Sequence, residues 1–160
     1  MFHIGDKIFY PMHGAGVIED IVEKEILGEK KQYYVMKIPC SNMEISIPAA
    51  NIEAIGVRGI IDADTAAAVM DYLRTQEVDY NSNWNVRYRE NLGKVKCGDI
   101  FEICKVVKSL MLRERVKNLS TGERKMLTSA KNILVSELLL SLNSSYDAID
   151  AQIDEIIEAI

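Results

Sequence analysis

One short stretch combines side chains that are well suited to binding nucleic acid. It holds the only tryptophan of the chain, Trp84, followed by Arg87, Tyr88 and Arg89, directly after a polar segment rich in Asn and Ser. If Asn83 caps a helix, the 3.6-residue repeat places Trp84, Arg87 and Tyr88 on one face. An exposed face with an indole, a guanidinium and a phenol can stack on bases and bind phosphates. The stretch is therefore a candidate nucleic-acid site.

The same spacing also permits a structural role. Trp84, Tyr88 and Leu92 lie four residues apart and can form an apolar stripe on a helix. Large aromatic side chains are highly buried on average, so residue type alone favours a core position for Trp84. The two roles can share one helix if Tyr88 and Leu92 pack inward while Trp84 and Arg87 project from its N-terminal end.

The net charge of −5 is distributed in three blocks. Residues 1–83 contribute −6, residues 84–131 contribute +7 and residues 132–160 contribute −6. A positive block inside an acidic chain is typical of an electrostatic footprint for nucleic acid. The alternative is a set of solvated helix faces on which basic residues happen to cluster.

The composition is that of a globular protein with one medium domain or two small ones. The chain has 160 residues, of which 48% are hydrophobic and 27% charged. It has no apolar run of the ~20 residues that span a bilayer, and its start lacks the pattern of a signal peptide. The three cysteines have no CxxC spacing, so we expect reduced thiols in a cytoplasmic protein; they are Cys40, Cys97 and Cys104.

Motifs of catalysis and metal binding are missing from the sequence. The segment 11–16 (PMHGAG) is rich in glycine, but it lacks the GK[ST] of a phosphate-binding loop and reads as a turn. The two histidines, His3 and His13, belong to no spaced ligand set, and no HExxH or GxSxG occurs. We therefore expect neither an enzyme nor a metal or cofactor site.

The pattern of apolar residues changes near Gly59 from that of strands to that of helices, which predicts an α+β protein. The first part has turn signals at short intervals, which predicts a small SH3- or Tudor-like β-barrel. We expect its strands at residues 7–10, 17–26, 32–38, 43–48 and 51–55. The hairpin turn lies at residues 27–30. We place the two domains at residues 1–58 and 59–160.

The second part reads as a purely helical domain. We expect helices from Asp62 or Asp64 to about Arg74, Trp84 to about Leu92, Gly98-Asp99 to about Lys117, Ser120 to about Leu142, and Ser144 or Ser145 to Ile160. Gly93 is expected to end the second helix. Ser120 and Glu123 form a capping box at the start of the fourth. Ala67, Met70 and Leu73 are expected to face the core from the first.

With this organisation, the chain resembles the CarD/CdnL family of bacterial RNA polymerase-binding transcription regulators over nearly its whole length. No single motif carries the resemblance, which rests on the order and spacing of many over about 130 positions. In the first part these are Gly5-Asp6, Tyr10-Pro11, His13-Gly14, Gly16, Gly28-Glu29, Tyr33, Pro48-Ala49, Asn51 and Gly56-Val57-Arg58. In the second they are Asn83-Trp84, Arg87-Tyr88, Asn91-Leu92, Gly98-Asp99, Leu119-Ser120, Gly122-Glu123, Met126-Leu127, Ala130 and Ile133-Leu134.

The resemblance implies a Tudor-like domain that binds the RNA polymerase β subunit and a helical domain that contacts promoter DNA at the upstream edge of the bubble. The family tryptophan that matches Trp84 is a wedge in the minor groove at the fork. The candidate DNA-contacting residues are Trp84, Arg87, Tyr88, Arg89, Arg113, Arg124 and Lys125. The candidate polymerase-contacting residues are Lys24, Glu44, Ile45, Ser46, Ile47 and Pro48.

One position departs from the family pattern. Ser46 stands in the edge strand where some relatives carry an arginine, so the polymerase contact is expected to depend on backbone pairing and on Ile45 and Ile47. We expect a monomer that stabilises the promoter open complex, in the cytoplasm and associated with the nucleoid through polymerase. The alternative is an adaptor that does not bind DNA and whose basic helical domain docks an acidic partner.

Overall fold

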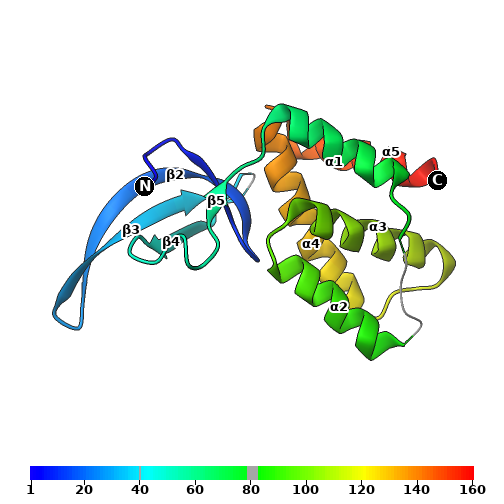
Figure 1. Ribbon diagram of the computed structural model, residues 1–160, viewed down its shortest axis with the longest axis horizontal. Helices are drawn as coiled ribbons and strands as arrows, with labels where there is room; N and C mark the ends of the chain where they lie inside the picture. Colours follow the sequence, from blue (N-terminus) through cyan, green and yellow to red (C-terminus); the bar gives the residue numbers. More distant parts are fainter. Residues whose placement is uncertain (40, 79–82) are drawn as a thin grey trace.

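An antiparallel sheet forms the N-terminal part of the protein, and helices form the rest (Figure 1). The structure is a computed structural model that describes residues 1–39, 41–78 and 83–160. Cys40 and part of the predicted polar connection, residues 79–82, lie outside the described residues. The strands are β1 Lys7–Tyr10, β2 Gly14–Ile26, β3 Glu29–Lys37, β4 Glu44–Pro48 and β5 Arg58–Gly59. The helices are α1 Ala63–Thr75, α2 Trp84–Lys96, α3 Ile100–Val116, α4 Thr121–Ser141 and α5 Tyr146–Glu158.

The sheet has the order β4-β3-β2-β1-β5, which makes β4 one of its edges. This arrangement confirms the α+β class and the Tudor-like N-terminal part. The outer halves of β2 and β3 continue past the other strands as a long hairpin, visible at the lower left of Figure 1. Its turn consists of Leu27 and Gly28, which both have positive φ, as a tight hairpin of this twist requires.

The predicted strand at residues 51–55 is wrong. This segment forms consecutive turns in which the N–H of Ile55 donates to the Asn51 carbonyl and that of Val57 to the Ile52 carbonyl. These local bonds occupy the groups that a strand would use, and the segment still buries Ile52 in the sheet's core. The fifth strand is Arg58–Gly59, which pairs with β1.

The predicted helix starts agree with the structure because each has a capping side chain. Oxygens of Asp62, Asn83, Asp99, Ser120 and Ser145 accept hydrogen bonds from backbone N–H groups of the first turns of α1 to α5.

Two predicted details of the helices are wrong. Helix α2 continues through Gly93 to Lys96, because burial of Val95 outweighs the ~1 kcal/mol that a helical glycine costs. In α1, Ala66 faces the core and Ala67 is exposed, because the buried face is formed with Val69, Met70 and Leu73.

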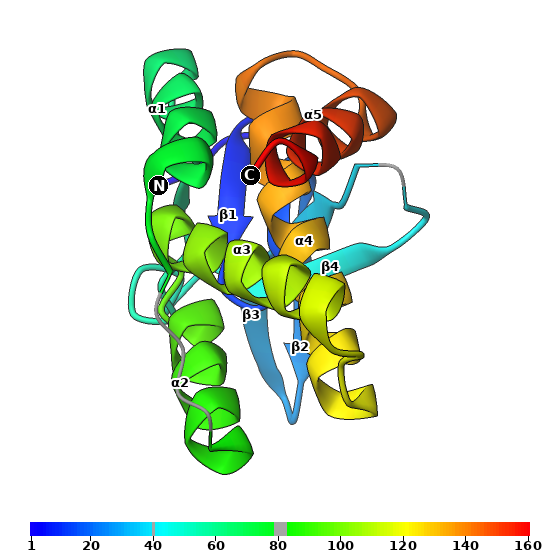
Figure 2. The same ribbon diagram turned by 90° about the vertical axis from the view of Figure 1, so that its right-hand side faces the viewer.

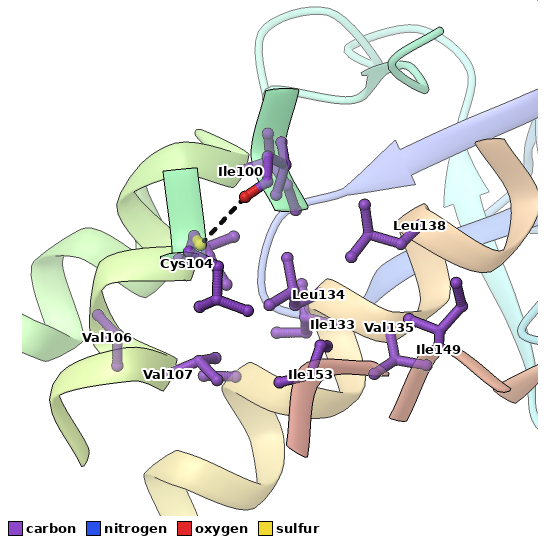
Figure 3. Packing of buried hydrophobic residues seen from close by; sticks show 14 of the residues in the cluster. Ile100, Cys104, Val106, Val107, Ile133, Leu134, Val135, Leu138, Ile149 and Ile153 are labelled. Atoms are coloured by element: carbon purple, nitrogen blue, oxygen red, sulfur yellow. Dashed lines mark hydrogen bonds between the residues drawn. The ribbon is translucent and has the colours of Figure 1, made fainter. Parts of the chain in front are cut away.

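Much of the helical core lies between α3, α4 and α5 (Figure 3), and α1 adds its buried face. Ile103, Leu134, Leu138, Ile149 and Ile153 are fully buried. Helix α5, which is acidic on its outer side, therefore closes the bundle. No helix in the part of the chain that the structure describes has the length and apolarity of a membrane span.

Candidate nucleic-acid interface

Helix α2 presents Trp84 as its first residue. The Asn83 side-chain oxygen accepts from the N–H groups of Asn85 and Val86, at 3.0 and 3.2 Å, as predicted for an N-cap. The cap fixes where the helix begins and so fixes the direction of the first side chain. In Figure 1, this end of α2 points away from the sheet, and the other end lies beside it. In Figure 2 the helices lie in front of the strands, with α2 below α1.

Trp84 is partly exposed, with 41% of its surface accessible. One face of its indole stacks on the Tyr88 ring, with 5.0 Å between centroids and 16° between planes. Its Nε1–H donates to the Ser120 hydroxyl oxygen at 3.0 Å. A Cβ on Gly122 would lie 3.5 and 3.6 Å from the two rings, which are ordinary van der Waals distances, so Gly122 packs directly beside the stack. The indole is thus held in one orientation while much of it remains in solvent.

Arg87, one turn further along the same helix, is only 3% exposed. Its Nε and Nη2 each donate to one carboxylate oxygen of Glu123, both at 2.9 Å. The expectation that Arg87 projects from the helix is therefore wrong. Arg87 lies on the side of α2 that faces the first turn of α4, where the buried carboxylate neutralises its charge.

Glu123 is the partner that sequence reasoning missed. The hydrogen bonds from Arg87 lower the pKa of the Glu123 carboxyl, against the effect of burial, and the charges of Arg87 and Arg113 add to this. The predicted capping box is half present, since the Glu123 N–H donates to Ser120 Oγ at 3.2 Å. The Glu123 carboxylate binds Arg87 instead of the N–H of Ser120, and Ser120 binds Trp84. The start of α4 therefore holds α2 through both Ser120 and Glu123.

The other predicted DNA-contacting residues differ in exposure. Arg89 and Lys125 are exposed, and Arg113 is half-buried. Arg124 is exposed, and its Nε lies 4.0 Å from a Glu114 oxygen, a weak contact at the surface.

Part of the basic block is used inside the fold. Lys131 pairs with Asp150 and Asp154, and Arg115 donates to the carbonyls of Ile157 and Ile160. Lys131, which pairs with two carboxylates from outside the block, therefore adds little to the exposed positive charge.

Strand β4 offers a second candidate surface, for a protein partner. The Ile38 N–H donates to the Met43 carbonyl, and the Ala49 N–H donates to the Gln32 carbonyl. In an antiparallel pair, every second residue of a strand directs its N–H toward the neighbouring strand. The register therefore turns the N–H groups of Glu44 and Ser46 away from β3. Ser46 Oγ accepts a hydrogen bond from Lys24 Nζ at 3.2 Å.

The side chains of β4 divide between its two faces. Glu44, Ser46 and Pro48 are exposed, and Ile45 is half-buried. The expectation that Ile47 contacts a partner is wrong, because Ile47 is 0% exposed and belongs to the core of the sheet.

Two family models match successive parts of the chain. Residues 2–61 match the CarD-like/TRCF RID domain, and residues 68–154 match the CarD C-terminal domain. The chain belongs to the CarD family of transcription regulators. The protein named "Putative transcription factor YdeB" of Bacillus subtilis (strain 168) is 44% identical over 138 residues, which cover 86% of this chain and 90% of that protein.

Both candidate surfaces fall within the CarD matches, with β4 in the first and α2 in the second. The sequence signal for Ser120 and Glu123 was the capping box, which identifies a helix start but not its long-range partners. Pairing of Glu123 with Arg87 spans 36 positions and depends on how α2 and α4 pack.

Proposed function

We propose that this CarD-family protein binds the RNA polymerase β subunit through the edge of β4 and stabilises the promoter open complex through Trp84. The observation that carries the proposal is the partly exposed indole, which Tyr88 and Ser120 orient at the end of α2 that points away from the sheet. The protein acts as a cytoplasmic monomer without a cofactor, and polymerase brings it to the promoter.

The exposed part of Trp84 is suited to filling an unstacked base step at the upstream edge of the bubble. Stacking of a base on an aromatic ring contributes ~1–3 kcal/mol, which corresponds to roughly a 5- to 150-fold change in an equilibrium. Because Tyr88 and Ser120 already hold the ring, little of this free energy is lost in ordering it on DNA. A wedge of this kind stabilises open DNA without catalysing a reaction.

Phosphate contacts are assigned to Arg89, Arg113, Arg124 and Lys125. Arg87 is excluded from direct contact with DNA because its guanidinium is buried and paired. Its role is to hold the start of α4, which carries Ser120, against α2 through Glu123. These four cations alone are expected to bind free DNA weakly, and a polymerase tether raises the binding through effective concentration.

The polymerase contact is assigned to the backbone of β4. Glu44 and Ser46 offer outward N–H groups to a strand of the β subunit, and Ile45 and Lys24 flank them. Pro48 lacks an N–H and limits the pairing to a short window.

The test of the wedge is the lifetime of the open complex with purified polymerase. Trp84→Ala is expected to shorten it by about 5- to 150-fold at unchanged affinity for polymerase. The matched control is Leu27→Ala, which removes a fully exposed apolar side chain from the hairpin tip and is expected to change nothing. If Trp84→Ala is folded and the lifetime of the open complex is unchanged, the role of Trp84 as a wedge is refuted. If a random acidic polymer then also competes with fork DNA for the helical domain, the result favours the alternative of an adaptor that docks an acidic partner.

The test of the edge compares two substitutions at Ser46. Ser46→Pro removes the outward N–H and is expected to weaken polymerase binding at least tenfold, because an edge strand tolerates proline but cannot then donate to a partner. Ser46→Ala keeps the N–H and loses only the hydroxyl, so it is expected to bind within about twofold. Equal affinities of the two variants contradict pairing through the edge.

A further inference from the structure

The sheet and the helices share a buried apolar interface. Phe9 and Ala15 of the sheet are both fully buried within the cluster formed by the helices. The Ala15 N–H donates to Ser136 Oγ of α4 at 2.9 Å. A Cβ on Gly14 would lie 2.7 Å from that oxygen and 3.4 Å from the Ile133 Cα, so β2 and α4 approach too closely for a larger residue.

An ion pair joins the last strand of the sheet to a buried carboxylate of α4, and the arginine side chain stays 34% exposed. The Arg58 guanidinium donates from Nη1 and Nη2 to the two carboxylate oxygens of Glu137, at 2.6 and 2.9 Å. Glu137 is 0% exposed, and its Oε2 also accepts from the Ile61 N–H at 3.0 Å. The guanidinium carbon lies 4.2 Å from the centre of the Phe9 ring. The planar fork of an arginine satisfies this set of contacts in one orientation only.

The same guanidinium holds the end of the helix that carries Trp84. Arg58 Nη2 donates to the Gly98 carbonyl at 3.0 Å, and Gly98 directly follows Cys97, the C-cap of α2. Trp84 is the first residue of this 13-residue helix, so it lies about 20 Å from the end that Arg58 holds. Ser120 and Glu123 hold α2 to α4, so the helices move together. A rotation of the helices as one body by about 10° about Gly98 displaces the indole by about 3 Å relative to the sheet, which exceeds the tolerance of a preorganised contact.

We propose that Arg58 and Glu137 are positioning residues that fix Trp84 relative to strand β4. The inference rests on the proposed function, in which β4 is attached to polymerase and Trp84 must meet the fork. A rigid connection between the two surfaces confines the indole to one place and so raises its effective concentration at the fork. A loose connection spreads the indole over many positions, most of them unproductive.

The decisive variants are Arg58→Lys and Glu137→Gln. Arg58→Lys keeps the charge but loses the two-pronged contact and the simultaneous bond to Gly98. Both variants are expected to bind polymerase within about twofold of the parent protein and to shorten the open-complex lifetime at least about fivefold. Fluorescence of Trp84, the only tryptophan, is expected to stay unchanged, because Tyr88 and Ser120 are not altered.

A double variant separates positioning from a general effect on stability. Arg58 and Glu137 together are called the clamp. If the clamp acts through the indole, adding Glu137→Gln to Trp84→Ala shortens the lifetime no further, because the effects of substitutions in one coupled unit do not add. Asp154→Asn is the matched control, because it weakens an ion pair with Lys131 inside the helical domain and leaves the clamp intact. This control is expected to keep the lifetime of the parent protein.

Three outcomes overturn the inference: lifetimes of both clamp variants equal to the parent, additive losses in the double variant, or an equal loss in Asp154→Asn. Thermal unfolding identifies the variants that are folded at the assay temperature. If Glu137→Gln is not folded at that temperature, the lifetime measured with Arg58→Lys alone tests the inference. If Trp84→Ala itself leaves the lifetime unchanged, the proposed function fails, which is distinguishable from failure of the clamp.

Discussion

Removal of the Arg87 side-chain charge is expected to destabilise the helical domain strongly. The two side chains of the ion pair are 4% and 2% exposed, so Arg87→Met leaves the Glu123 carboxylate buried without its partner. Breaking a buried pair from one side costs about 3–5 kcal/mol. For a chain of this size each kcal/mol lowers Tm by ~2–4 °C, so the expected fall is roughly 6–20 °C.

Urea unfolding of four proteins measures this cost. Arg87→Met is compared with the parent, with the exposed neighbour Arg89→Met, and with the double variant Arg87→Met/Glu123→Met. Arg89→Met is expected to stay within about 0.5 kcal/mol of the parent, and the double variant to regain most of the loss because no charge is left buried. A free energy of unfolding for Arg87→Met equal to that of Arg89→Met refutes the assignment of Arg87 as a buried structural residue.

The same pair makes a prediction about acid. Because the folded-state pKa of Glu123 is lowered, the stability that it contributes is complete above the unfolded carboxyl pKa of about 4.3 and is lost as pH falls through the lower folded value. The difference in unfolding free energy between the parent and Glu123→Gln is therefore expected to be constant from about pH 8 to pH 5 and to shrink below about pH 4. A difference that grows in acid contradicts the pairing.

Two further perturbations test the fold. Burial raises the pKa of the Cys104 thiol to about 12, so about one molecule in ten thousand carries the reactive thiolate at pH 8. In a Cys40→Ser background, a thiol reagent is expected to modify the exposed Cys97 promptly and Cys104 only on unfolding. Equal rates of modification of Cys97 and Cys104 contradict the burial of Cys104. Gly16→Ala places a Cβ 2.5 Å from the Lys37 carbonyl oxygen and is expected to lower Tm by several degrees, whereas Gly59→Ala, with open space around it, serves as the control that leaves Tm unchanged.

Features that depend on neighbouring residues were predictable from the sequence. Helix starts are such features, because Asn83 or Ser120 caps the turn that directly follows it. The position of Trp84 at the start of a helix was predictable for the same reason. The turns at residues 51–56 were not, since Ile52 has the same apolar character in a strand and in a turn that buries it.

Features that depend on packing between distant segments were not predictable. Arg87 has the residue type of a phosphate ligand, and only the approach of α4 shows that a carboxylate 36 positions away already binds it. Arg58 appeared only within the motif Gly56-Val57-Arg58, and nothing in the sequence linked it to Glu137, 79 positions away. The alternation in β4 correctly indicated a half-buried strand, but it did not tell which of Ile45 and Ile47 lies deeper.

The free edge of β4 also bears on how the protein behaves at high concentration. An unpaired strand can add a copy of itself as readily as a strand of a partner, and such pairing leads to aggregation. Here the edge spans only Glu44–Pro48, begins with a carboxylate and ends with a proline. Charge and proline at an edge both oppose growth of the sheet by further copies. A surface that is open to one strand of another protein is in this way poorly suited to nucleating fibres.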